Sequence, residues 1–210
     1  IPPEVYRRLV EHVRAALPIL HRYLALRRRA LGVERLGYED LYAPLAGGPE
    51  ATYTPELAME RVLEAVAPLG TEYQAIVRKG REERWVDFFP SPGKRSGAYS
   101  ETAYGAHPCQ LHNFVGLYED VSTLAHEFGH SVHSWLADRA QPYATRDYST
   151  FVAEVASTFN ESLLFHDGIR RAEDDATRLS LLGSRLESLR TTIFRQTMFA
   201  EFERTVHWYV

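Results

Sequence analysis

Residues 118–137 read YEDVSTLAHEFGHSVHSWLA, and the expected fold and chemistry of the chain both start from this stretch. Its apolar residues recur at helical spacing and are frequent enough to predict a largely buried helix from about Val121 to Ala137. Asp120 is the expected N-cap, because an aspartate oxygen can accept from a free backbone N–H of the first turn. Inside the helix lies HEFGH, residues 126–130, which is an HExxH motif.

The HExxH spacing predicts a metal site. Residues four apart lie on one face of a helix, so His126 and His130 can bind the same ion. Glu127 lies beside them, where its carboxylate can act as general base on a metal-bound water. The alternative is a chance motif with two solvated histidines. The apolar surroundings favour a metal, because buried imidazoles and a buried carboxylate need partners.

A third ligand must come from elsewhere in the chain. His133 lies on nearly the same face as His126, but about 10 Å from it along the axis at about 1.5 Å rise per residue. The metzincin pattern needs a glycine and then a histidine where this chain has His133 and Leu136, so that class is excluded. The remaining candidates are downstream carboxylates, namely Asp138, Asp147, Glu154, Glu161 and Asp167.

Residues 151–165, FVAEVASTFNESLLF, predict a second helix that is apolar around most of its circumference. Its polar residues form one stripe at helical spacing: Glu154, Ser157, Thr158, Glu161 and Ser162. The stripe is consistent with a buried hydrogen-bond network or with the solvent side of an amphipathic helix. We favour Glu154 as the third ligand, with Ser157, Thr158 or Glu161 hydrogen-bonded behind the ligands. Glu161 lies two turns beyond Glu154, so both are not expected on one ion.

Four blocks of the sequence agree in order and spacing with a known family. They are GKRSGAYS (93–100), HPCQLHNF (107–114), HEFGHSVHSWLA (126–137) and TFVAEVASTFNESLLF (150–165). Over most of its length the chain resembles the oligoendopeptidase F branch of the thimet oligopeptidase family, zinc metallopeptidases that cut short peptides. This resemblance implies a mostly helical, zincin-type metallopeptidase catalytic domain. It also implies that His126, His130 and Glu154 bind one zinc ion and that Glu127 is the general base.

The resemblance further implies an edge strand that binds substrate. In the GKRSGAYS block, the backbone at Gly97, Ala98 and Tyr99 would pair with an extended oligopeptide, and such β-augmentation needs little side-chain selectivity. Glycine is suited to this place because it lets another backbone approach closely. An ordinary surface hairpin with a glycine bend is the alternative.

Family members are usually longer and carry a His/Tyr-bearing loop beyond the third ligand. We therefore expect residues 1–210 to form a single domain that is part of a metallopeptidase catalytic domain. The expected activity is endopeptidase hydrolysis of short oligopeptides by a water that zinc binds and Glu127 activates. Two alternatives stay open, a zinc carboxypeptidase and a zinc-bearing fragment without turnover.

Composition narrows the class of protein further. A hydrophobic content of 45% is ordinary for a globular domain, and the net charge of −4 gives no reason to expect nucleic-acid binding. No apolar stretch approaches membrane-spanning length, so no membrane partner is expected. Cys109 is the single cysteine, which excludes an internal disulfide and suits a cytoplasmic location. Nothing in the sequence indicates the oligomeric state.

The expected fold is mainly α with a small antiparallel β-sheet. Helices are predicted at about residues 4–31, 54–67, 72–79, 121–137, 151–165 and 179–194, the first of them kinked near Pro18. Residues 96–104 and 110–117 predict the two strands of a hairpin. The leucine-rich stripe of the last helix is expected to lie in the core.

Overall fold

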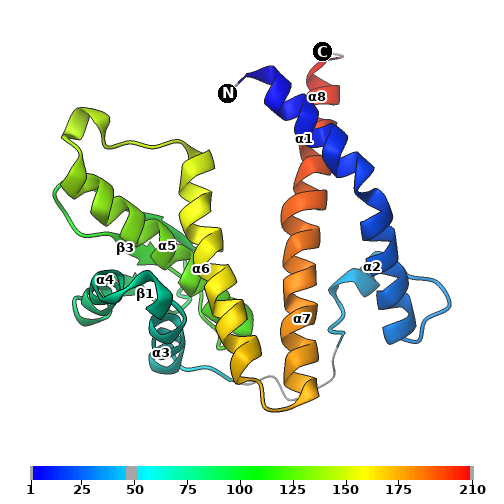
Figure 1. Cartoon of the computed structure of the whole chain (residues 1–210), viewed down its shortest axis with the longest axis horizontal. Helices are drawn as coiled ribbons and strands as arrows, with labels where there is room; N and C mark the ends of the chain where they lie inside the picture. Colours follow the sequence, from blue (N-terminus) through cyan, green and yellow to red (C-terminus); the bar gives the residue numbers. More distant parts are fainter. Residues whose placement is uncertain (1, 46–51, 209–210) are drawn as a thin grey trace. The chain divides into compact units, whose positions relative to one another are not determined.

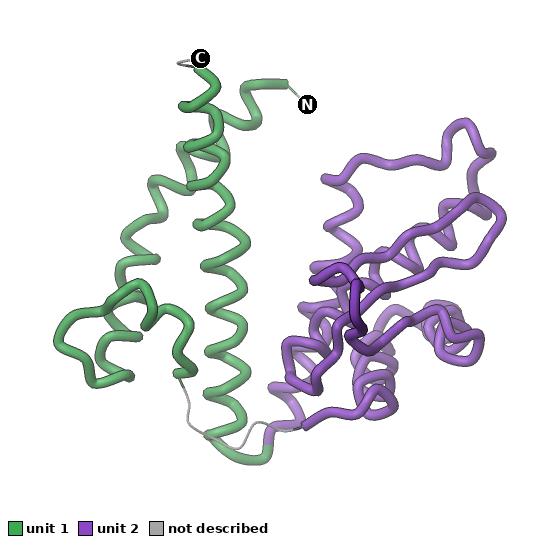
Figure 2. Tube along the Cα trace, turned by 180° about the vertical axis from the view of Figure 1, so that it is seen from behind, with its two compact units in different colours: residues 1–48, 173–210 green, residues 49–172 purple. Residues whose placement is uncertain are grey.

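The structure is a computed structural model that describes residues 2–45 and 52–208, and it is mostly helical (Figure 1). The chain divides into two compact units, one of Ile1–Gly48 with Glu173–Val210 and the other of Pro49–Ala172 (Figure 2). No composition shift or linker in the sequence indicates this division, and the single domain over residues 1–210 stays a prediction.

The unit Pro49–Ala172 contains the sheet and the two motif helices. Its elements are α3 (Pro55–Ala65), η2 (Ala67–Leu69), α4 (Thr71–Glu82), β1 (Val86–Asp87), β2 (Tyr99–Glu101), β3 (Cys109–Leu111), α5 (Tyr118–Ala140), η3 (Tyr143–Thr145) and α6 (Thr150–Arg171). Thr54 caps α3 by accepting from the Leu57 N–H at 3.3 Å, and a proline opens the helix. The helices therefore begin close to where the sequence predicted them.

The sheet is mixed, which corrects the expected antiparallel one. Strands β2 and β3 form the predicted antiparallel hairpin, with Ser100 opposite Gln110. Strand β1 adds to the other side of β3 in parallel, with Val86 opposite Gln110. The sequence did not reveal β1 because two residues are too few to show an alternating pattern. The resulting order β1-β3-β2 leaves β2 at an edge of the sheet.

Helix α5 lies in the core of its unit, as predicted. Apolar side chains of α3, α4 and α5 pack with residues next to the sheet, among them Met59, Val62, Val77, Trp85, Phe114, Leu124, Phe128 and Val132. Gly80 of α4 permits this packing, because a Cβ there would lie 2.8 Å from the Phe128 ring and 2.9 Å from the Trp85 ring. The helix that carries the HExxH motif is thus held by close contacts on its apolar side.

Asp120 stabilises the start of α5 in a different way from the one predicted. The N-cap residue is Leu117, and Asp120 is the third residue of the helix. Its Oδ2 accepts from the backbone N–H groups of Val115, Gly116 and Leu117 at 2.8–2.9 Å. The carboxylate therefore reaches back over the turn before the helix, where it also opposes the positive end of the helix dipole.

Helix α6 is less buried than expected. Its polar stripe faces α5, whereas several apolar residues on the other side are exposed: Phe151, Val152, Val155 and Phe159. The Phe151 residue, for example, has 72% of its surface exposed. The apolar residues that surround most of this helix are therefore not all buried.

The unit formed by the two ends of the chain is helical. Its elements are α1 (Pro3–Ala15), α2 (Leu17–Ala30), η1 (Glu39–Tyr42), α7 (Asp175–Leu189), the π-helical turn η4 (Arg190–Arg195) and α8 (Gln196–Trp208). The predicted kink near Pro18 is the junction of α1 and α2 at Ala16. The leucine-rich stripe of α7 is exposed, with Leu179, Leu182, Leu186 and Leu189 each at least 38% accessible, so the core expected there is wrong.

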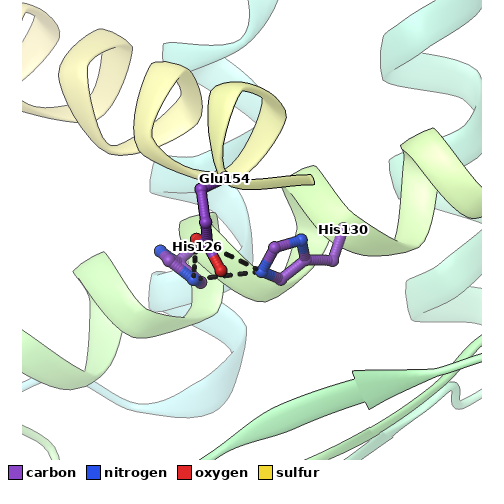
Figure 3. A group of neighbouring side chains, drawn as sticks. All are labelled: His126, His130 and Glu154. Atoms are coloured by element: carbon purple, nitrogen blue, oxygen red, sulfur yellow. Dashed lines mark hydrogen bonds and ion pairs between the residues drawn. The ribbon is translucent and has the colours of Figure 1, made fainter. Parts of the chain in front are cut away.

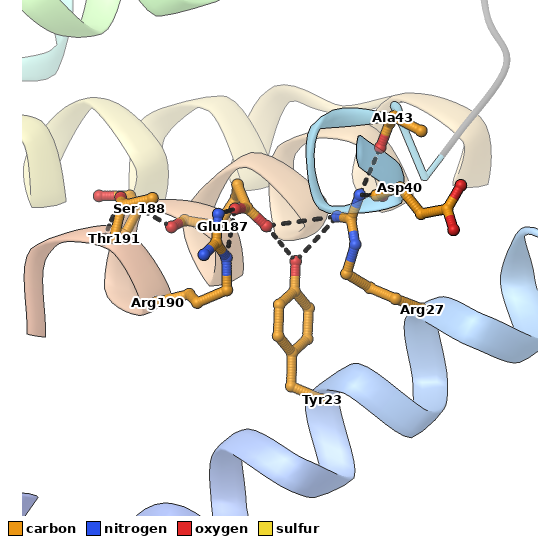
Figure 4. A network of polar contacts seen from close by, with 8 residues as sticks. All are labelled: Tyr23, Arg27, Asp40, Ala43, Glu187, Ser188, Arg190 and Thr191. Atoms are coloured by element: carbon orange, nitrogen blue, oxygen red, sulfur yellow. Dashed lines mark hydrogen bonds and ion pairs between the residues drawn. The ribbon is translucent and has the colours of Figure 1, made fainter. Parts of the chain in front are cut away.

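A buried arginine organises this unit (Figure 4). Arg27 is 2% exposed, and its Nη1 donates to Tyr23 Oη at 3.2 Å and to Glu187 Oε2 at 3.3 Å. Its Nη2 donates to the backbone carbonyls of Asp40 and Ala43 at 2.7 and 2.6 Å. One guanidinium therefore joins α2, η1 and α7.

In the described ranges 2–45 and 52–208, no helix is both long and apolar enough to cross a membrane.

Candidate functional site

The two helices α5 and α6 bring His126, His130 and Glu154 together (Figure 3). The Nε2 atoms of the two histidines are 3.1 Å apart, one helical turn from each other on α5. Glu154 Oε2, from α6, lies 3.4 Å from His126 Nε2 and 3.7 Å from His130 Nε2. Three atoms that carry lone pairs therefore face one another in a triangle.

Gly129 is the reason that α6 can lie so close to α5. A Cβ at position 129 would be 2.6 Å from Ser157 Cα and 2.7 Å from the Ala156 carbonyl oxygen, distances that real Cβ atoms do not reach. The backbones of the two helices are thus in direct contact beside the histidines. This contact allows the short Glu154 side chain to reach both imidazoles.

Asn160 holds the same crossing from one turn further along. It is 1% exposed, and its Nδ2 donates to the Ala125 carbonyl of α5 at 3.0 Å. Its Oδ1 accepts from Tyr73 Oη of α4 at 3.0 Å. The α5–α6 crossing is therefore fixed by a satisfied hydrogen-bond network as well as by backbone contact.

The side chains around the triangle orient its members. His126 Nδ1 lies 2.5 Å from Glu161 Oε1, so this ring nitrogen donates outward and the Nε2 lone pair faces the site. Ser157 Oγ donates to Glu154 Oε2 at 2.8 Å. Thr158 is placed differently: its hydroxyl donates to the Glu154 backbone carbonyl within the helix rather than to the carboxylate.

The two histidines have opposite pKa shifts. Burial alone would lower the pKa of His126, but the hydrogen bond and charge of Glu161 outweigh it, so the pKa is raised. The pKa of His130 is lowered, first by burial and then by the neighbouring His126 charge. The environment thus favours a neutral, lone-pair-bearing His130 at neutral pH, the form in which imidazole binds metals.

Glu127 lies next to the triangle and is almost fully buried, at 5% exposed. Within residues 2–45 and 52–208, its Oε2 has no hydrogen-bond partner. Burial raises the pKa of this carboxyl to about 6, and the charges of Glu154 and Glu161 act in the same direction against His126. A buried carboxylate oxygen without a partner is costly, so it points to a bound group that the protein itself does not supply.

The triangle fits a zinc ion. Zinc bonds of about 2.0–2.1 Å in tetrahedral geometry imply ligand atoms about 3.3–3.5 Å apart. The observed separations of 3.1, 3.4 and 3.7 Å lie around this value. Two imidazoles and one carboxylate are also the donor set of catalytic rather than structural zinc sites, because three ligands leave one position open.

The other candidate ligands lie outside the triangle. His133 stacks on Tyr148, with ring centroids 3.8 Å apart. Asp138 is paired with Arg146 at 2.9 Å, and Asp167 is paired with Arg171 at 2.6 Å. Asp147 has a side chain that is 92% exposed and contacts Arg146. Each has a partner of its own and none belongs to the cluster that the described residues form.

The three expected substrate-binding residues lie at the start of the edge strand. Tyr99 is the first residue of β2, and Gly97 and Ala98 precede it. Gly97 has φ of +87°, which explains the glycine by backbone conformation, and nothing in the chain lies within 4 Å of its missing Cβ. The Gly97 carbonyl already accepts from Asn113 Nδ2 at 2.8 Å.

Gly129 and Asn160 were not singled out from the sequence. Gly129 lies inside the HExxH motif, where a glycine is unfavourable for a helix interior, and that cost was the available signal. Asn160 lies among the residues of the polar stripe but was not counted with them, although a buried amide side chain also needs a partner. Both residues determine the distance between α5 and α6 rather than the chemistry.

Comparison with known proteins identifies the family. Oligopeptidase PepF of Bacillus subtilis (strain 168) is 48% identical over 207 residues, which cover 99% of this chain and 31% of that protein. A solved structure of a Chlamydophila abortus protein matches 99% of this chain and 35% of its own length, with a TM-score of 0.84 and 36% identity. Oligoendopeptidase-F from Enterococcus faecium matches 99% of this chain and 29% of its own length, with a TM-score of 0.63 and 34% identity.

The extent of these matches also bears on the chain itself. The chain spans about a third of the length of the curated relatives it matches. The resemblance to oligoendopeptidase F drawn from the four sequence blocks is confirmed by these relatives. The model of Peptidase family M3 matches residues 1–209, so the chain belongs to peptidase family M3.

Proposed function

We propose that this chain carries the metal centre of a zinc-dependent endopeptidase that hydrolyses short oligopeptides. The observation that carries the proposal is the triangle of His126, His130 and Glu154 beside the buried Glu127, whose Oε2 has no partner among the described residues. A purely structural metal site has no use for such a carboxylate, whereas hydrolysis requires a base. Membership of family M3 supports a peptidase.

Each residue has a role that follows from its contacts. His126, His130 and Glu154 hold zinc, which supplies Lewis acidity to the scissile carbonyl and to a water molecule when it is bound. Glu127 takes the proton of the attacking water and delivers it to the leaving amine. Glu161 keeps the Nε2 lone pair of His126 directed into the site.

The substrate in this proposal is an extended peptide paired with strand β2. In the order β1-β3-β2 the outer edge of β2 has no partner among the strands that the structure describes. Backbone pairing at residues 97–99 would align different peptides with little dependence on their side chains. This mode of binding suits an enzyme that acts on short oligopeptides.

The decisive experiment combines metal content with cleavage. The purified chain is dialysed and its zinc content is measured by mass spectrometry. An internally quenched peptide, acetylated at its N-terminus and amidated at its C-terminus, is then offered with and without a chelator. We expect one zinc per chain and cleavage that stops with chelator and returns with added zinc.

Two variants give the matched test of the ligand assignment. His130→Ala should lose zinc, whereas His133→Ala, the same truncation three residues further on, should keep it, because His133 stacks on Tyr148 outside the triangle. A chain without zinc would refute the proposal. Cleavage confined to peptides with a free C-terminus would indicate a carboxypeptidase, and zinc without any cleavage would indicate a fragment that has no turnover.

A further inference from the structure

A line of buried polar side chains joins the edge strand of the sheet to helix α5. Ser131 is fully buried, and its Oγ lies 2.8 Å from Ser100 Oγ and 2.8 Å from Gln110 Nε2. Gln110 Oε1 is in turn 2.9 Å from His112 Nε2. Ser100 and Gln110 lie directly opposite each other in the β2–β3 pair, so both side chains reach the same hydroxyl.

The donors and acceptors of this network follow a single order. The Gln110 amide nitrogen can only donate, so Ser131 Oγ accepts from it, and Gln110 Oε1 accepts from His112 Nε2. Burial lowers the pKa of His112 to about 4, and the charge of Lys94 acts in the same direction, so the ring is neutral at pH 7. The proton of that ring is therefore on Nε2, and the network leads from His112 to the Ser131–Ser100 bond.

Such a network does more than fill space. Apolar side chains of similar size would pack there without the cost of burying polar groups. A satisfied hydrogen-bond network instead defines one relative position of the elements that it joins. Its two ends are informative: Ser131 directly follows His130 in α5, and Ser100 is the central residue of the edge strand β2.

We propose that Ser100, Ser131 and Gln110 are positioning residues that set the distance between a peptide on the free edge of β2 and the Glu127 carboxylate. The inference rests on the proposed endopeptidase function and adds a role for side chains that fix the position of strand β2. None of the three side chains touches the metal triangle. A misplacement of about 1 Å in a bound substrate can lower the rate by about 100-fold, so a small shift of β2 is enough.

The test uses Ser100→Ala, Ser131→Ala and the double variant in the zinc-loaded chain, with the quenched, end-blocked peptide as substrate. Ser100→Ala should lower kcat by about 10–100-fold with little change in KM, zinc content or melting temperature. Ser131→Ala should lower kcat at least as much, and its melting temperature should also fall because the buried Gln110 amide loses its acceptor. The double variant should lose no more than Ser131→Ala alone, because that change already removes the Ser131–Ser100 hydrogen bond together with the one from Gln110.

Two further variants serve as controls. Ser100→Thr retains the hydroxyl and should keep kcat close to that of the unchanged chain, which a loss of packing alone would not explain. Ser180→Ala removes the hydroxyl of an exposed serine in α7 and should have no effect. Amide hydrogen exchange of residues 99–101 adds a readout that needs no turnover, and it should be about tenfold faster in Ser100→Ala.

The possible outcomes separate this inference from the proposed function. Activity within twofold of the unchanged chain in both single variants would overturn the positioning role while the endopeptidase stands. In Ser100→Ala, activity that falls in parallel with zinc content or melting temperature would also overturn it, because the network would then only support the fold. If the unchanged chain does not cleave, the proposed function is contradicted, and unaltered exchange at residues 99–101 would independently overturn the network's hold on β2.

Discussion

Each unit of the molecule contains a buried cluster of charged residues, and the two clusters differ in how completely their groups are paired. Around Arg27, each of Nη1 and Nη2 has two acceptors, and Glu187 pairs with both Arg27 and Arg190; of the three Arg27 nitrogens, Nε lacks an acceptor within the described residues. Around His126 and His130, three lone-pair atoms face one another and Glu127 Oε2 has no partner in the part of the chain that the structure describes.

The difference indicates what each cluster is for. A cluster whose donors are met by acceptors of the protein itself needs no ligand to hold its elements together, and that of Arg27 joins α2, η1 and α7. The two imidazoles and the carboxylate of the other cluster can instead bind one cation together, a partner that the protein itself does not supply. Pairing, rather than burial or charge, therefore separates a structural network from a candidate site. The following predictions test this distinction.

The largest effect is expected on turnover. Glu127→Gln removes the base but keeps the shape of the side chain, so kcat should fall by about 10²–10⁴-fold while zinc content stays at that of the unchanged chain. Cleavage of the quenched peptide and metal analysis of the same sample measure both quantities. Glu60→Gln, at an exposed position of α3, is the control and should leave both unchanged. Glu127→Gln with the activity of the unchanged chain would remove Glu127 from the mechanism.

The next largest effect is expected on stability, when the cluster around Arg27 is broken. Arg27→Ala leaves two buried carbonyls without their donor and removes one of the donors to Glu187, which keeps Tyr23 and Arg190, so the free energy of unfolding should fall by about 2–4 kcal/mol. Urea denaturation measures the loss, and Arg29→Ala, exposed on the same helix, should change it little. Zinc content per folded chain should not change. A lower zinc affinity at equal folded fraction would contradict the distinction between the clusters.

A smaller effect is expected on zinc affinity, when the carboxylate that accepts from His126 is compared with the one that accepts from Arg27. Glu161→Gln weakens the acceptor on His126 Nδ1, so zinc affinity should fall by about 10–100-fold, as for other residues that orient a metal-binding histidine. Glu187→Gln, the corresponding change beside Arg27, should lower stability but leave zinc affinity unchanged. Competition with a chelating dye measures the affinity. Equal zinc affinities for the two variants would show that Glu161 does not orient His126.

The smallest effect is the pH dependence of stability from His112. Its pKa is lowered to about 4 in the folded chain, first by burial, so protonation favours the unfolded chain. The contribution of the neutral ring is complete above about pH 6.5 and is lost as the pH falls toward 4, about 2 kcal/mol of it by pH 5. His112→Gln keeps a donor toward Gln110 and should flatten this part of the profile. Unfolding free energies at pH 7, 6 and 5 give the comparison, and identical slopes would contradict it.

The site residues within one helix could be predicted from the sequence because their geometry is local. The spacing of His126 and His130 places both on one face of any α-helix, whatever surrounds it. Glu154 was found through the polar stripe of a second helix, although the distance between the helices depends on Gly129, and a single glycine forms no pattern. The roles of these residues remain predictions.

The errors in the fold have a common origin. The leucines of α7 were expected in a core, because periodicity shows that a helix has an apolar face but not what covers it, and the apolar residues of α6 show the same limit. Strand β1 was missed since its two residues pair with β3, a strand more than twenty positions away. Long-range pairing and the partner of an apolar face are set by tertiary structure, which local patterns do not record.

The backbone contact at Gly129 makes zinc binding and helix association one equilibrium under the proposed function. An ion held by His126, His130 and Glu154 would act as a removable cross-link between α5 and α6. It would bind only the associated helices and stabilise them by about 2.7 kcal/mol when free zinc is 100-fold above its dissociation constant. The melting temperature of the chain should therefore rise with the logarithm of the free zinc concentration, and a chelator that removes the ion should lower it.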